Sequence, residues 1–147
     1  MTVPEELEEV MTTETELAES LIGILRQQQD AIVHSRADEL ASLVNRSEEL
    51  LRPMETLEKE RSRLAASLFN DMAGHQTEIT VDRLLARAGN STPRLGSVIR
   101  RLRDASHEIL KINSVNKPLL EHSRQFIRHT LRAATDDYKK NLIDKKM

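Results

Sequence analysis

The residues of this chain that could carry chemistry are a few histidines and carboxylates in its C-terminal third. His107 and Lys111 lie four residues apart, and a histidine beside a lysine on an exposed helix face can accept a phosphoryl group. Such a site needs the lysine and a small residue at set positions beside the histidine. Here the lysine is displaced by one position and the small residue is missing. The sequence therefore gives no basis for phosphotransfer.

Metal binding and catalysis need more ligands than the sequence brings together. A di-iron bundle requires two Glu-x-x-His pairs and two further carboxylates, whereas the nearest approach is the single pair Asp104 and His107. His122 and His129 are two helical turns apart, too far to hold one ion together. No phosphate loop, Ser/His/Asp arrangement or paired carboxylates stand out. We interpret the histidines as solvated surface groups and expect no enzyme activity, cofactor or metal.

The elements that carry these residues are amphipathic helices. The 147 residues include 31% charged side chains, no Cys or Trp, and only three aromatic residues, so the core must be thin and aliphatic. Apolar residues recur three and four apart, as in a coiled-coil seam. We predict one all-α domain spanning residues 1–147. It is an antiparallel helical bundle, up-down-up, of three long helices with a short connecting helix and an overhanging C-terminal helix.

Capping signals and breaks in the repeat give the expected bounds. Pro4 is a good first-turn residue, Asp38 is the expected N-cap of the second helix, and Thr92 and Pro93 start the longest one. Pro53 and Pro118 should each kink a helix without ending it. The predicted elements are helices over 4–34, 38–69, 81–88 and 92–135, a loop over 70–80, and a flexible tail over 136–147.

The seam of the first helix has two polar positions, Glu14 and Gln28, which we interpret as register-setting or edge positions. Its members are Leu7, Met11, Glu14, Ala18, Leu21, Leu25, Gln28 and Ile32.

Charge is distributed unevenly along the chain. Every charged residue from Glu5 to Glu19 is acidic, whereas the balance turns basic beyond Pro93. We interpret this as an acidic first helix packed beside a basic long helix. Binding of DNA or RNA is the weaker alternative, since stacking aromatics and groove-reading motifs are missing. We expect a cytoplasmic protein, because residues 1–9 lack the features of a signal peptide and no run is long enough to span a bilayer.

The longest helix should overhang the other two. At 1.5 Å per residue it would span about 60 Å, against about 45 Å for each partner. Its end still carries apolar residues at helical spacing, namely Leu131, Ala134, Tyr138 and Leu142. An uncovered apolar face of this kind either frays or is reserved for a partner, and we favour a partner. Homodimerisation would also cover it.

The stretch from Ile112 to Ile127 resembles the most recognisable segment of the FlgN family. In that family two asparagines three apart precede a Leu-Leu pair, a Ser and an aromatic-aliphatic pair on the long C-terminal helix. The matching residues here are Asn113, Asn116, Leu119, Leu120, Ser123, Phe126 and Ile127.

This resemblance implies a cytoplasmic flagellar export chaperone for the type III pathway. Its partners would be the hook-associated proteins of the hook–filament junction, whose C-terminal helices it would bind, and the export gate. The expected cargo-binding residues are Asn113, Asn116, Leu119, Leu120, Phe126, Ile127, Leu131 and Leu142. Tyr138 is the candidate for docking on the export gate, or else a partly buried helix-end residue.

Two alternatives stay open at this point. Asn116 falls on the seam, where a buried Asn must find a hydrogen-bond partner and thereby restricts register; a structural role then competes with cargo contact. The chain could also be a generic coiled-coil scaffold or a secretion chaperone with other cargo.

Overall fold

The structure, a computed structural model, describes residues 1–69, 81–89 and 92–146, and it leaves undescribed the side chains at 123, 126–127, 130–131, 134–135 and 137–146. All regular structure in these ranges is helical, which confirms the all-α prediction. The predicted loop over 70–80 lies outside the described residues. The helices are α1 (Val3–Val33), α2 (Ala37–Leu68), α3 (Val81–Ala88) and α4 (Pro93–Lys146).

Local capping chemistry sets where α1 and α2 begin. Thr2 is the N-cap of α1 and forms a capping box with Glu5, so the helix starts one residue before Pro4. Ser35 turns the chain with a φ of 54°, and Arg36 is the N-cap of α2. The prediction of Asp38 as N-cap was therefore wrong. Asp38 lies in the first turn instead, where its negative charge interacts favourably with the positive end of the helix dipole.

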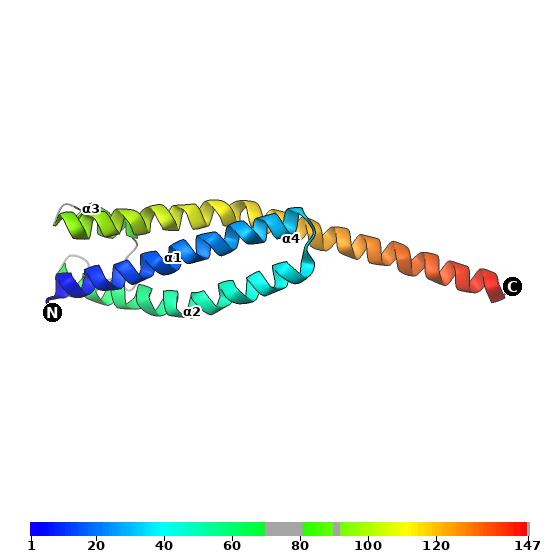
Figure 1. Ribbon diagram of the computed structural model, residues 1–147, viewed down its shortest axis with the longest axis horizontal. Coiled ribbons are helices and arrows are strands. Elements are labelled where there is room, and N and C mark those ends of the chain that lie inside the picture. The colour runs from blue at the N-terminus through cyan, green and yellow to red at the C-terminus, as the bar shows by residue number, and fades with distance from the viewer. Residues whose placement is uncertain (70–80, 90–91, 147) are drawn as a thin grey trace.

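The three long helices lie side by side, with α1 in the middle (Figure 1). α1 and α4 run in the same direction and α2 runs against both, which gives the predicted up-down-up order. α1 packs along both α2 and α4, while α2 and α4 make little direct contact over the described residues. All eight predicted seam residues of α1 are buried. The core is therefore built on the two sides of α1.

Ion pairs join α1 to α4 along their length. Arg94 lies 3.1 Å from Glu8, and Arg101 lies 2.8 Å from Glu19. These contacts confirm that the acidic first helix lies beside the basic long helix. The pairs are largely exposed, so each contributes at most about 1 kcal/mol, and their main effect is to favour one register.

α4 is one helix that continues through Pro118 and ends at Lys146. The predicted helix end at 135 was wrong, because the stretch that was expected to form a tail is helical up to Lys146. Residues 136–146 contain no Pro or Gly to stop the helix, and Lys and Leu are good helix formers. The start of α4 was predicted correctly. Thr92 caps the helix, since its Oγ1 accepts a 3.1 Å hydrogen bond from the backbone N–H of Leu95.

α2 is likewise continuous through Pro53. None of the described helices is both long and apolar enough to cross a membrane.

Candidate functional site

The C-terminal part of α4 extends beyond the other helices as a single rod (Figure 1). α1 ends at Val33 and α2 begins at Ala37, and the turn between them lies near the middle of α4. The last 27 residues of α4, Leu120–Lys146 (called the overhang below), correspond to about 40 Å of helix at 1.5 Å per residue. The predicted overhang is thus present in the structure.

The two asparagines that precede the overhang lie in different environments. Asn116 is 5% exposed, and its Nδ2 donates a 2.9 Å hydrogen bond to the backbone carbonyl of Leu25 in α1. Asn113, one turn earlier, is half-buried. The Asn116 bond ties α4 to α1 at one register, which supports its structural role. Cargo contact by either asparagine stays a prediction.

The remaining predicted cargo residues follow along the overhang. Leu119 and Leu120 are half-buried at its base. The backbone positions of the others belong to α4, but their side chains lie outside what the structure describes: Phe126, Ile127, Leu131, Tyr138 and Leu142. Their roles in binding cargo and docking on the gate therefore stay predictions.

Exposed basic side chains line one side of the overhang. A surface hollow of about 410 Å³ lies against His122, Gln125, Arg128, His129 and Arg132. All five side chains are exposed. This side of the helix would attract an acidic partner, with a strength that falls as salt increases.

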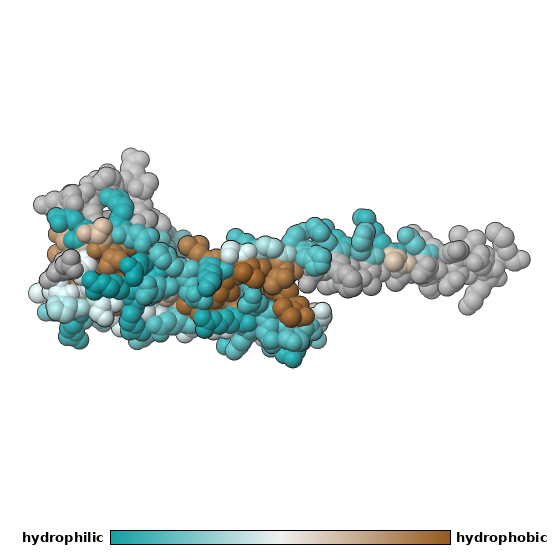
Figure 2. Space-filling model, turned by 90° about the horizontal axis from the view of Figure 1, so that it is seen from above, coloured by the Kyte–Doolittle hydropathy of each residue, from teal (hydrophilic) through white to brown (hydrophobic). Residues whose placement is uncertain are grey.

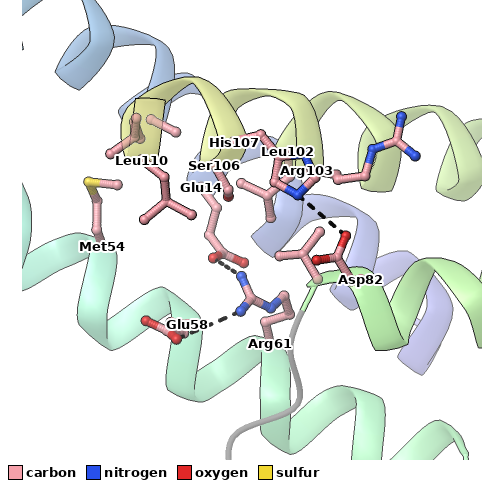
Figure 3. Close-up of a pocket in the computed structure, with 13 residues that line it drawn as sticks. Glu14, Met54, Glu58, Arg61, Asp82, Leu102, Arg103, Ser106, His107 and Leu110 are labelled. Carbon is pink, nitrogen blue, oxygen red and sulfur yellow. Dashed lines mark hydrogen bonds and ion pairs between the residues drawn. The ribbon is translucent and has the colours of Figure 1, made fainter. Parts of the chain in front are cut away.

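A second surface feature is a groove between α2 and α4, in the body of the molecule. It has a volume of about 420 Å³ and is lined by residues of all four helices. Its floor holds Glu14 of α1 and Arg61 of α2, whose side chains are 7% and 6% exposed and form an ion pair (Figure 3). Burial raises the pKa of Glu14 to about 7, against the opposing effect of the Arg61 charge.

Apolar side chains surround this ion pair. Ala18, Met54, Leu102, Ile109 and Leu110 line the groove, and Leu110 is 67% exposed. Figure 2 shows a band of apolar surface along the body of the molecule, flanked by hydrophilic side chains. A protein that presented an apolar helix face could cover this surface.

The residues first considered for chemistry are spread out and engaged elsewhere. His107 is exposed, and its Nε2 lies 3.5 Å from Oδ1 of Asp82 in α3. Asp104 accepts hydrogen bonds from the neighbouring Arg103. Within the described ranges, no three His, Asp or Glu side chains are grouped as a metal site would need.

The groove was not predicted from the sequence. Glu14 falls on the predicted seam of α1, and Arg61 shares the buried face of α2 with Leu64 and Ala65. Opposite charges on two facing apolar faces were the signal that could have paired them.

Comparison with known proteins adds one finding to this geometry. A protein-family model described as FlgN protein matches residues 1–142, nearly the whole chain. No curated protein and no solved structure matches the chain.

Proposed function

Because this chain belongs to the FlgN family of flagellar export chaperones, we propose that it binds the C-terminal helices of hook–filament junction proteins. It holds these helices in the cytoplasm, prevents their premature self-association and delivers them to the export gate. Cargo helices that later polymerise must expose apolar faces. A chaperone can cover such faces by completing a helical bundle with them.

The observation that carries this proposal is the overhang of α4. A helix that leaves its bundle for about 40 Å offers a surface along which cargo helices can pack. The predicted contacts Leu120, Ile127, Leu131 and Leu142 share one face of it by the helical period. Arg128 and Arg132 are exposed at the edge of this face, where they would steer acidic segments of the cargo.

Because the overhang is already helical, little conformational entropy is lost when cargo binds. Affinity then depends on the number of apolar contacts. A moderate affinity suits a chaperone, since the cargo must be released for export.

The test places charge on the proposed face. Leu131→Asp combined with Leu142→Asp should weaken binding to the C-terminal segment of a hook-associated protein by about tenfold or more, because each change buries a carboxylate against apolar side chains. The matched control compares Leu131→Asp alone with Ala133→Asp, which adds the same charge at an exposed position on the opposite side of the helix and outside the basic hollow. Isothermal titration calorimetry measures both. Equal affinities for the two variants would show that cargo does not bind this face.

Docking on the export gate is a separate proposal for Tyr138. A Tyr138→Ala variant should bind cargo with unchanged affinity and fail to associate with the gate in a pull-down. If gate association were unchanged, Tyr138 would have no docking role, and the cargo proposal would be unaffected.

A further inference from the structure

The two prolines that lie inside helices differ in the packing around them. Pro53 of α2 and Pro118 of α4 are both exposed, and each removes the backbone N–H that would bond to the carbonyl four residues earlier. α2 is held on both sides of its proline, because Leu43 before it and Leu64 after it are buried. Beyond Pro118, none of the described side chains of α4 is buried. The same backbone defect is therefore fixed by packing in α2 and held on one side only in α4.

The last anchor of α4 on the body of the molecule lies two residues before Pro118. Ile112 is buried in a cluster with Leu21 and Leu25 of α1. One turn later, Nδ2 of Asn116 donates its 2.9 Å hydrogen bond to the backbone carbonyl of Leu25. The part of α4 that precedes Pro118 is thus fixed to α1 by packing and by a buried hydrogen bond.

The stretch that ends at Pro118 is also a weak helix former. Residues 113–118 read Asn-Ser-Val-Asn-Lys-Pro, and Asn, Ser and Val have lower helix propensity than Leu, Arg or Lys. Oγ of Ser114 donates a 2.6 Å hydrogen bond to the backbone carbonyl of Lys111, and such bonds from a serine often bend a helix. The carbonyl that lacks its helical partner because of Pro118 is that of Ser114. Ser114 is exposed, so water can bond to this carbonyl when the helix bends.

We propose that Pro118 is a hinge at the base of the overhang, about which the overhang changes direction as one rod while the body keeps its packing. Figure 1 shows that the overhang slopes away from the direction in which the first part of α4 runs. A change in direction of about 20°, the size of a proline kink, moves position 133 by about 8 Å, since that position lies about 22 Å beyond the hinge.

The hinge bears on cargo binding because the predicted cargo contacts lie on both sides of it. Asn113 precedes Pro118, whereas Leu120 and the later contacts follow it. A cargo helix that contacts both groups bridges the hinge and holds the overhang in one direction. This part of the inference rests on the proposed chaperone function, and the hinge itself does not.

The experiment measures distances between the body and the overhang. Because the chain contains no Cys, two engineered cysteines carry spin labels at defined sites, and double electron–electron resonance gives the distribution of distances between them. The reporting pair is Ser42→Cys on α2 with Ala133→Cys on the overhang. The reference pair combines Ser42→Cys with Lys111→Cys, on the fixed side of the hinge. All three positions are exposed. We expect the reporting distribution to be broader than the reference distribution by about 8 Å.

A proline replacement then tests the position of the hinge. Pro118→Ala restores a donor for the carbonyl of Ser114 and should narrow the reporting distribution to the width of the reference pair. The matched control is Pro53→Ala, the same change at an exposed proline that packing fixes on both sides, and it should leave both distributions unchanged. Equally narrow distributions in the native chain would show that there is no hinge. A broad reporting distribution that Pro118→Ala does not narrow would show that α4 bends elsewhere. Either result overturns the proposal.

Adding the C-terminal segment of a hook-associated protein from the same organism separates this inference from the proposed function. We expect the bound segment to narrow the reporting distribution of the native chain. If the segment binds and the distribution stays broad, cargo does not bridge the hinge, and that part of the inference is overturned. If the segment does not bind, the chaperone proposal is overturned, while the distributions of the free chain still decide whether Pro118 is a hinge.

Discussion

The buried carboxyl of Glu14 should make the stability of this protein fall as pH rises. Its side chain is 7% exposed, and burial raises its pKa from 4.5 to about 7. Unfolding exposes the group to water, where it ionises near 4.5. Between these two pH values the folded chain holds a proton that the unfolded chain has lost. Each unit by which the pH rises therefore lowers the unfolding free energy. Below pH 4.5 and above about pH 7, the contribution of Glu14 to the unfolding free energy does not change with pH.

The size of the effect follows from the width of this window. A difference of about 2.5 pH units, at 1.36 kcal/mol per unit, corresponds to about 3 kcal/mol of unfolding free energy. Glu14→Gln cannot titrate and keeps a hydrogen-bond acceptor for Arg61. The stability of the native chain minus that of Glu14→Gln should therefore decrease by about 3 kcal/mol from pH 4.5 to pH 7.5.

Urea unfolding followed by circular dichroism at 222 nm measures this difference. All other carboxylates are present in both the native chain and Glu14→Gln, so their contributions cancel in the difference between the two unfolding free energies. Glu16→Gln, on an exposed face of the same helix, controls for the loss of one negative charge. A difference for Glu14 that rises with pH would show that the attraction to Arg61 outweighs burial, and it would refute the reasoning.

Three further predictions concern packing. Asn116→Leu should raise the unfolding free energy by about 1 kcal/mol in urea titrations. The hydrogen bond to Leu25 is lost, but the unpaired Oδ1 is removed and leucine has the better helix propensity. A loss of stability would show that the hydrogen bond is a net stabilising contact. Gly23→Ala should stabilise α1 by about 1 kcal/mol, since a Cβ there meets nothing within 4 Å. Gly96→Ala should lower the melting temperature, because its Cβ would come within 2.2 Å of the carbonyl oxygen of Gly89; thermal melts that rank these two alanine variants the other way round would contradict the packing between the end of α3 and the start of α4.

Helical periodicity predicted the elements because each helix buries a face that its own sequence defines. All eight predicted seam residues of α1 are buried, and Thr15, Ile24 and Ala31 are buried as well, since α1 has a neighbour on both sides. The overhang followed from helix lengths alone. The pairing of α1 with α4 followed from their opposite charges.

The groove could not be predicted in the same way. Periodicity shows which face of a helix is apolar, but not whether the two outer helices of three close on each other. In this structure they do not, so Leu110 stays exposed and Glu14 meets Arg61 beneath an open surface. The end of α4 was missed because the sequence after 135 was interpreted as a tail, although it contains no stop signal.

The most direct test of the account is size-exclusion chromatography with light scattering. The full chain, and a version ending at Thr130 that keeps α1, α2, α3 and their contacts with α4, are each mixed with the C-terminal segment of a hook-associated protein from the same organism. The account predicts a stoichiometric complex with the full chain and none with the shortened chain at the same concentration. A full chain that forms no complex would contradict it.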